Sequence, residues 1–495
     1  MSKKLGFNNE IYIEKQKENI QKRIGTFGGK LYLEFGGKLF DDYHASRVLV
    51  GFKPDIKVQM LKSMADKAEI VIVINSGDIE KNKIRGDLGI TYDADVLRLI
   101  DAFRGIGLYV GSVVISQFAE QPSAKAFKAK LERLGIKVYI HYPIEGYPYN
   151  VQKIVSEEGF GRNDYIETTR PLVVVTAPGP GSGKMATCLS QLYHEGLRGV
   201  TAGYAKFETF PIWNLPLKHP VNLAYEAATA DLNDVNMIDP YHLEAYGVTT
   251  VNYNRDVEVF PVLSAIFDKI YGHCPYKSPT DMGVNMAGFA ITDDEVCREA
   301  SRNEIIRRYF NAKCDVRTGR GTEAAVEKIE LIMKQAGISV ADRKVVQTAL
   351  DKEELTDKPA VAIELPDGRI VTGKTSDLLG PSAAALLNAT KAIAGTAKNV
   401  HLIDRSIIEP IQRLKINVLG NHNPRLHSDE VLVALSISAL LNEEAKKAVA
   451  ALSELRGCEA HSTVILSQVD ADIYRKLGIN LTCEPKYQTK KLFHG

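Results

Sequence analysis

A strand-like run followed by glycines and a lysine is the part of this sequence best suited to bind an anion. The segment reads Leu172–Thr176, then Ala177-Pro-Gly-Pro-Gly-Ser-Gly-Lys184, then a helical pattern through Leu192. Glycines let backbone N–H groups approach an anion, a helix N-terminus adds partial positive charge, and lysine neutralises negative charge. We therefore predict a phosphate- or nucleotide-binding loop made by Gly179, Gly181, Ser182, Gly183, Lys184 and Thr187.

This loop is P-loop-like but departs from the full Walker A motif at two positions. Pro178 replaces the first glycine, and Met185 replaces the Ser or Thr that binds Mg²⁺. The hydroxyl of Thr187 comes two residues too late in the sequence. Three interpretations stay open: a site for ATP or GTP with Mg²⁺, a site for the phosphate of another small molecule, and a tight turn without a ligand.

Two other motif matches fail on their context. Gly368-Arg-Ile-Val-Thr-Gly-Lys-Thr375 satisfies Walker A letter by letter, but its β-branched residues follow a Pro-Asp-Gly turn and predict a hairpin strand. His194-Glu195 begins a zinc-protease motif whose second histidine is replaced by Arg198. We expect no HExxH zinc protease and no zinc, since the six cysteines never form CxxC.

Two further groups of polar residues are candidates for substrate contact and catalysis. Glycines and charged residues follow the first predicted strand, where open α/β sheets bind ligands, so we predict substrate contacts at Glu34, Gly36, Gly37, Lys38 and His44. A polar segment near residue 235 concentrates carboxylates that could hold Mg²⁺ or act as a base, namely Asp231, Asp234 and Asp239. The alternatives are ordinary turn chemistry at the first group and a solvated loop at the second.

The elements that would position these residues alternate between strands and helices. Short apolar runs predict strands at 31–35, 48–51, 70–74, 109–115, 138–142 and 172–176, with helices such as 54–67, 93–104 and 123–134 between them. This order favours parallel strands joined by helical crossovers. The fold class we predict is α/β, with a mostly parallel N-terminal sheet that carries the glycine-rich phosphate-type loop.

Changes in amino-acid composition and in the pattern of expected elements along the chain predict three domains. Residues 1–210 form the N-terminal α/β domain, 211–335 a helical and loop-rich insertion with recurrent prolines, and 336–495 a C-terminal α/β domain. In the last we expect a hairpin over 360–372 and a helix over 428–441. A clear helix, capped by Thr322 and ended by Gly337, closes the insertion.

Composition narrows the class of protein and of partner. The chain has 62 basic and 61 acidic residues, is 45% hydrophobic and 25% charged, and lacks an apolar N-terminal leader or a long apolar run. We expect a cytoplasmic multidomain protein with reduced thiols, and no nucleic acid or membrane partner.

Three stretches together resemble one bacterial family. They are Gly28–His44, Ala177–Lys184 and Asp377–Ala384. The chain is similar to bacterial uncharacterised protein family number three hundred seventy-one, also called domain of unknown function eighteen forty-six. The resemblance implies a soluble, bacterial, multidomain protein, and it carries over no catalytic residues.

The residues favour three hypotheses about function. The first is an ATP- or GTP-dependent phosphotransferase or ligase, in which Lys184 binds phosphates and an aspartate binds Mg²⁺ or activates the acceptor. The second is a sugar-phosphate-type enzyme without a nucleotide, and the third is a non-catalytic nucleotide sensor. For assembly, the apolar stretch Val431–Leu441 predicts either an intrachain cover or a homodimer through the C-terminal domain.

Overall fold

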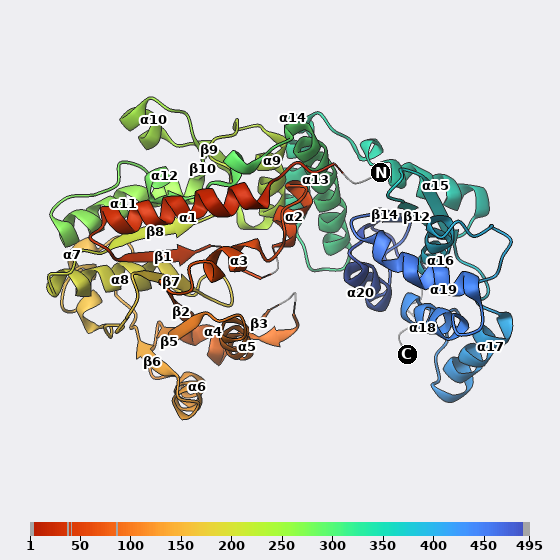
Figure 1. Ribbon diagram of the computed structural model, residues 1–495, viewed down its shortest axis with the longest axis horizontal. Coiled ribbons are helices and arrows are strands. Elements are labelled where there is room, and N and C mark those ends of the chain that lie inside the picture. Colours follow the sequence, from red (N-terminus) through yellow and green to blue (C-terminus); the bar gives the residue numbers. More distant parts are fainter. Residues whose placement is uncertain (1–3, 37–38, 41, 86–87, 489–495) are drawn as a thin grey trace. The chain divides into compact units, whose positions relative to one another are not determined.

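The computed structural model describes residues 4–36, 39–40, 42–85 and 88–488, in two compact units (Figure 1). The N-terminal unit comprises Leu5–Tyr225 and Asp234–Ser301, and the C-terminal unit comprises Glu226–Asn233 and Arg302–Gly495 with the first four residues. Each unit has its own sheet and its own core. The three-domain division drawn from sequence texture stays a prediction.

The N-terminal unit is built on a seven-stranded sheet in which every neighbouring pair is parallel. This confirms the predicted parallel α/β sheet. Across the sheet the strands are β11 (Gly283–Val284), β8 (Gly203–Phe207), β1 (Leu31–Phe35), β7 (Leu172–Thr176), β2 (Ala68–Asn75), β5 (Tyr109–Ser116) and β6 (Lys137–Ile140).

The central strands are buried on both faces, as expected for parallel strands with helical crossovers. Every residue of β1 and β7 is buried, which explains why Leu172-Val-Val-Val-Thr176 has no polar alternation. On one face, Tyr32, Val73 and Val175 pack with residues of α8 (Lys184–Leu197) and α11 (Asn254–Tyr271). The helix α8 therefore starts at the carboxyl end of a central strand and runs back along the sheet.

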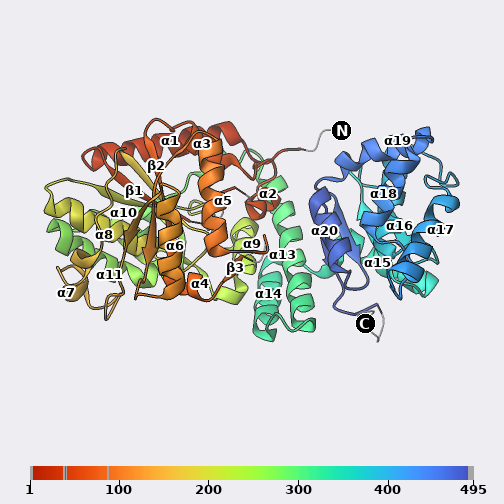
Figure 2. The ribbon, with the colours of Figure 1, turned by 90° about the horizontal axis from the view of Figure 1, so that it is seen from below.

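The remaining elements of this unit surround the sheet. The helices α5 (Tyr92–Gly105) and α6 (Pro122–Arg133) pack along β5 and β6 (Figure 2). The other helices are α1 (Asn9–Thr26), α2 (Tyr43–Val48), α3 (Ile56–Lys62), α4 (Ser76–Glu80), α7 (Val151–Ile154), α9 (Pro220–Ala228), α10 (Pro240–Tyr246) and α12 (Pro279–Met282). Two antiparallel ribbons pair β3 (Ile84–Arg85) with β4 (Ile90–Thr91) and β9 (Asn236–Ile238) with β10 (Val251–Tyr253).

The strand order creates two points at which neighbouring strands continue in opposite directions. From β7 the chain crosses β1 to reach β8, whereas from the adjacent β2 it continues to β5 on the other side. From β8 it continues outward to β11, whereas from the adjacent β1 it crosses β7 to reach β2. In open α/β sheets, ligands bind outside the carboxyl ends of the strands at such switch points.

The C-terminal unit contains a mixed four-stranded sheet. Its order is β13 (Ile370–Lys374), β12 (Ala360–Glu364), β14 (Glu459–Ser462) and β15 (Asn480–Cys483), antiparallel except between the last two. The predicted hairpin is confirmed as β12–β13, so the segment that spells Walker A is a strand. The helices are α14 (Glu323–Ala336), α15 (Lys344–Thr356), α16 (Pro381–Ile393), α17 (Arg405–Arg413), α18 (Ser428–Ser438), α19 (Glu443–Ala450) and α20 (Gln468–Leu477).

The long helix α13 (Asp294–Arg317) begins in the N-terminal unit and continues into the C-terminal one. The predicted helix before Gly337 is confirmed as α14, with the Thr322 side chain capping it. In the described residues, no helix has the length and apolar character needed to cross a membrane.

Candidate functional site

The glycine-rich loop lies at the β7/β2 switch point, and hydrogen bonds hold its carbonyl groups. Ser116 Oγ, at the end of β5, donates to the Ser182 carbonyl oxygen at 2.6 Å. Asn75 Nδ2, at the end of β2, donates to the Gly181 carbonyl oxygen at 3.4 Å, and Ser182 Oγ donates to that of Gly179. Two of these carbonyl groups accept hydrogen bonds from the neighbouring strands and the third from the loop's own serine, and these bonds hold the loop conformation.

Two of the loop glycines are required by the backbone and by close packing. Gly183, the residue before α8, has φ +89°, and a Cβ there would lie 3.0 Å from Ser116 Oγ. Gly179 lies against the ring of Tyr92, where a Cβ would be 2.3 Å from the phenol oxygen. Any side chain at these two positions would displace the loop, so its glycines are explained by geometry.

The start of α8 presents unused donors. Gly183 offers no capping side chain, so the N–H groups of Lys184, Met185 and Ala186 have no acceptor within the described part of the chain. The Lys184 ammonium also has no carboxylate partner among the described residues. A helix N-terminus with free amides and a free cation is suited to bind an anion.

Thr187, one turn into α8, contacts a buried histidine. Its Oγ1 lies 3.5 Å from His141 Nδ1, at the limit of hydrogen-bond distance, while His141 Nε2 lies 3.2 Å from the Asp164 carbonyl oxygen. Burial lowers the pKa of His141 to about 3, so the ring is neutral at physiological pH. A shallow pocket beside the loop is lined by Ser116, Gln117, His141, Tyr142, Ile144, Tyr147, Phe160, Asn163, Gly183, Ala186 and Thr187.

A second polar group lies at the β8/β1 switch point. Lys206 Nζ contacts Asp256 Oδ2 at 2.6 Å and Glu208 Oε1 at 2.7 Å, and the Tyr253 hydroxyl donates to Glu208 Oε1 at 2.6 Å. On the neighbouring strand, Glu34 accepts a hydrogen bond of 2.7 Å from Tyr204. We call Lys206, Glu208, Tyr253 and Asp256 the lysine–carboxylate cluster.

Burial and neighbouring charges shift the pKa values of Lys206 and Glu208 in this cluster. Burial raises the pKa of Glu208 to about 7, with Asp256 adding to the effect against the opposing Lys206. Burial lowers the pKa of Lys206, but Asp256 and Glu208 outweigh it and hold the ammonium charged. The cluster therefore combines a charged ammonium with a carboxyl group whose pKa is raised above its ordinary value.

Cys188, a buried residue of α8, interacts electrostatically with Glu34 and Lys184. Burial raises the pKa of the Cys188 thiol on α8, the negative charge of Glu34 raises it further, and the Lys184 ammonium lowers it. Charges near both switch points thus affect the pKa of Cys188. The two lie along one edge of one sheet.

The three aspartates predicted for catalysis have different surroundings. Asp231 is exposed in the C-terminal unit, whereas Asp234 and Asp239 belong to the N-terminal unit. Asp234 is paired with Arg255 at 2.6 Å. Asp239 caps α10 through the N–H groups of Tyr241 and His242, and its other oxygen accepts two hydrogen bonds from Thr280. No group of three or more His, Cys, Asp or Glu in the described residues could hold a metal ion.

The predicted substrate residues are only partly described. Glu34 lies beside the lysine–carboxylate cluster, and Gly36 donates its N–H to the Phe207 carbonyl oxygen at 3.0 Å, where a Cβ would not fit. His44, on α2, packs edge-on against Phe210. Gly37 and Lys38 lie outside the described residues.

The His194-Glu195 pair has a structural role. His194 Nε2 lies 2.8 Å from the Asn163 carbonyl oxygen, and the buried Glu195 carboxylate binds Lys30 and the Tyr32 hydroxyl. Both residues belong to α8, and each side chain is held by different partners in the core.

Four residues of this edge were missed in the sequence. Ser116 directly follows the predicted strand 109–115, a signal that could have found it, whereas His141 falls within the predicted strand 138–142 and follows the shorter β6 of the structure. Tyr253 ends the short β10 and Asp256 lies in the first turn of α11, and both reach Lys206 across about fifty residues, a contact that no sequence signal indicates.

Comparisons with known proteins agree along the whole chain. Residues 5–337 match the family model for the N-terminal domain of unknown function DUF1846, and residues 341–493 match its C-terminal counterpart. A UPF0371 protein of Streptococcus thermophilus (strain CNRZ 1066) is 59% identical over 491 residues, 99% of both chains. A UPF0371 protein of Streptococcus pneumoniae (strain JJA) is 58% identical over the same share of both chains. The resemblance noted in the sequence is confirmed, and the chain belongs to the UPF0371 family, with both DUF1846 domains present.

Proposed function

We propose that the N-terminal unit binds a phosphorylated small molecule, with its phosphate at the Gly179–Lys184 loop. The observation that carries this proposal is the loop itself: its carbonyls are tied back by Ser116 and Asn75, while the first amides of α8 and the Lys184 ammonium have no partner among the described residues. A phosphate would satisfy these donors and balance that charge.

The side chains around the loop favour a phosphate ester over a Mg²⁺–nucleotide. Met185 packs against the apolar core, where a P-loop has its Mg²⁺-binding hydroxyl, and the Thr187 hydroxyl is buried against His141. ATP or GTP with Mg²⁺ is the second candidate. That candidate would need a Mg²⁺ ion coordinated mainly by the nucleotide phosphates and by water.

The reaction assigned to this edge is proton transfer assisted by a fixed cation. Glu208 would give or take the proton, while Lys206, held by Asp256, would stabilise negative charge on the substrate. We place this role at Glu208 because Asp239 uses both carboxylate oxygens for structural hydrogen bonds and Asp234 is bound to Arg255.

A thermal-shift panel with matched variants tests the proposal. Inorganic phosphate, pyrophosphate, sugar phosphates, and ATP with and without Mg²⁺ are compared on wild type, Lys184→Ala and Lys15→Ala. Lys15 is an exposed lysine of α1 that serves as the control for charge removal. At roughly tenfold the dissociation constant we expect an upward shift of about 3 °C.

The pattern of shifts separates the alternatives. Stabilisation by sugar phosphates, lost in Lys184→Ala and kept in Lys15→Ala, supports the proposal. Stabilisation by ATP with Mg²⁺ alone favours the nucleotide site, and labelled γ-phosphate transfer then separates a transferase or ligase from a sensor. Equal shifts in wild type and Lys184→Ala for every compound would refute the loop as the phosphate site.

A further inference from the structure

The helix α18 in the C-terminal unit has two apolar faces, and only one of them is covered. Val431, Ala434 and Leu435 are buried in a core with residues of α17 and α19. On the outer side, Val433 is 60% exposed and Ile437 50%, and just past the helix end Leu440 is 80% and Leu441 97% exposed. The helix α19 thus covers the inner face alone, and no other described segment covers the outer one.

A second run of exposed apolar side chains lies on the neighbouring element. It occupies the π-helix Leu414–Val418, which follows α17, and the residue after it, and its members are Leu414, Ile416, Val418 and Leu419. The ion pair of Lys415 with Glu430, at 2.7 Å, ties this segment to the first turn of α18. The ribbons of α17 and α18 lie side by side in both views (Figures 1 and 2).

The area of this surface matches half of a protein–protein interface. Taking roughly 100 Å² for a fully exposed aliphatic side chain, the eight residues present about 500 Å² of apolar area. A standard interface buries about 800 Å² on each partner, of which about 65% is apolar in homodimers, so its apolar part is also about 500 Å². Monomeric proteins seldom expose more than a few hundred Å² of contiguous apolar surface.

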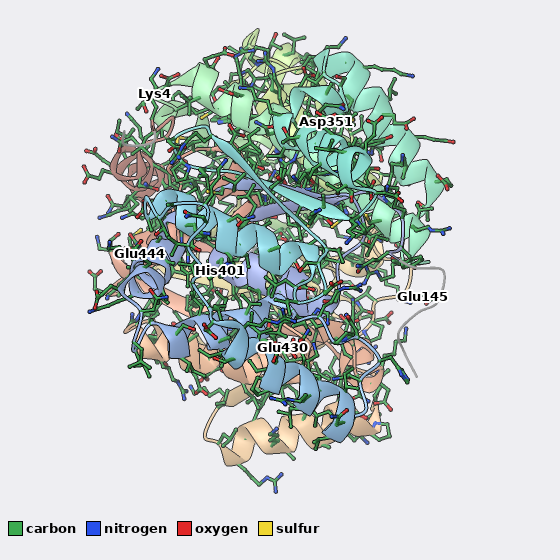
Figure 3. All side chains as sticks on the ribbon, turned by 90° about the vertical axis from the view of Figure 1, so that its right-hand side faces the viewer. Lys4, Glu145, Asp351, His401, Glu430 and Glu444 are labelled. Carbon is green, nitrogen blue, oxygen red and sulfur yellow. The ribbon has the colours of Figure 1, made fainter. Side chains whose placement is uncertain are left out.

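Charge argues against a membrane or a charged macromolecule as the occupant. No ionisable residue occurs from Val431 to Leu441. The carboxylates that flank the stretch are paired with lysines, Glu430 with Lys415 before it and Glu443 and Glu444 with Lys446 and Lys447 after it, so the flanks carry no excess of positive charge (Figure 3 labels Glu430 and Glu444). Helices that bind lipid surfaces or nucleic acid carry an excess of Lys or Arg at such positions, which this stretch lacks.

We infer that the outer face of α18 is a self-association surface, covered by the same face of a second copy of this chain. A depression lined by Leu432, Val433, Ser436, Ile437 and Leu440 lies on this face, with the protruding Leu441 side chain beside it. A two-fold axis places the protruding residue of each copy against the depression of the other. Neutral, self-complementary helix surfaces can pack in this way without a charged partner to select them.

The test measures the mass of the full chain in solution and compares two matched substitutions. Sedimentation velocity is run at micromolar concentrations on wild type, Leu440→Glu and Leu355→Glu. Leu355, on α15 of the same unit, is also 80% exposed but lies outside the surface, so it controls for placing a glutamate at an exposed leucine. Circular dichroism checks that each variant is folded.

The inference predicts twice the chain mass of 54.6 kDa for wild type and for Leu355→Glu, and a single chain mass for Leu440→Glu. Burying a glutamate at the centre of this contact should weaken association at least a hundredfold. A wild type that stays at 54.6 kDa over the whole concentration range overturns the inference, as does a dimer whose stability is the same in all three proteins.

Discussion

Ser116 Oγ donates a 2.6 Å hydrogen bond to the Ser182 carbonyl oxygen, which joins the end of β5 to the glycine-rich loop. The bond fixes the direction of the Ser182 carbonyl, so the N–H of Gly183 in the same trans peptide unit points the opposite way. A serine at the end of one strand thereby orients the candidate anion site at the end of another.

The first prediction concerns this bond. Replacing Ser116 by Ala should weaken inorganic phosphate binding about five- to tenfold, since a lost hydrogen bond costs about 1 kcal/mol and the loop loses its anchor. Isothermal titration calorimetry measures the change. The control is Ser112→Ala, which removes a buried hydroxyl of the same strand that has no partner among the described residues. Equal loss in both variants would contradict the role of Ser116.

A second prediction separates structure from catalysis at Asp239. Its carboxylate accepts four hydrogen bonds, from α10 and from Thr280, and is fully buried. Asp239→Ala should lower the free energy of unfolding by about 2–4 kcal/mol, because a cap and two further bonds are lost. Urea denaturation checks this. An unchanged midpoint would show that the carboxylate is dispensable for folding and return it to the catalytic candidates.

A third prediction follows from the buried pair of Lys30 with Glu195. The Glu195 side chain is 1% exposed and that of Lys30 16%, and the Tyr32 hydroxyl also donates to Glu195 at 2.7 Å. Glu195→Ala leaves a partly buried ammonium and a buried hydroxyl without an acceptor, so we expect a loss of about 3–5 kcal/mol. Chemical denaturation of this variant and of exposed Glu14→Ala gives the comparison, and similar losses in both would be contrary to the prediction.

The fourth prediction is a pH dependence in the C-terminal unit. Asp470 accepts hydrogen bonds from Ser428 and lies 2.9 Å from His427 Nδ1. Burial by itself raises the pKa of Asp470, but the hydrogen bonds with His427 and Ser428 outweigh it and lower the pKa below its ordinary 3.8. The hydrogen bond with Asp470 raises the pKa of His427 above its ordinary 6.5.

The two shifts stabilise the unit in different pH windows. A lowered carboxyl pKa gives stability that is present above pH 3.8 and is lost as the pH falls through the folded value. A raised histidine pKa gives stability that is present below pH 6.5 and is lost as the pH rises through the folded value. The melting temperature should therefore be highest between these values, and Asp470→Asn should flatten the profile. A wild-type profile already as flat as that of the variant would exclude the mechanism.

The fold was predictable wherever a local pattern decides the element. The β-branched run of Leu172–Thr176 and the capped helix before Gly337 are as expected. The run Val48–Gly51 was wrongly predicted as a strand: Val48 ends α2 and Leu49 caps it, and their burial comes from helix packing. The strand β8 was not predicted, because Gly203 and Lys206 interrupt its apolar pattern and only tertiary partners compensate for them.

The candidate site was predictable to the same extent. The Gly179–Lys184 loop can be recognised in the sequence because its residues are consecutive. The lysine–carboxylate cluster does not, since Lys206 and Asp256 meet only after the sheet and α11 have formed. Short-range spacing favoured Asp231, Asp234 and Asp239 instead, whereas the contacts of Asp234 with Arg255 and of Asp239 with Thr280 form only in the folded chain.

Hydrogen–deuterium exchange of the loop tests the central claim most directly, because it reads the backbone amides assigned to the phosphate. Wild type and Lys184→Ala are compared with and without millimolar inorganic phosphate, and peptides covering residues 177–188 are followed by mass spectrometry. The account predicts slower exchange at the start of α8 when phosphate is present, and little change in Lys184→Ala. Phosphate that slows exchange elsewhere in the chain while leaving residues 177–188 unchanged would contradict it.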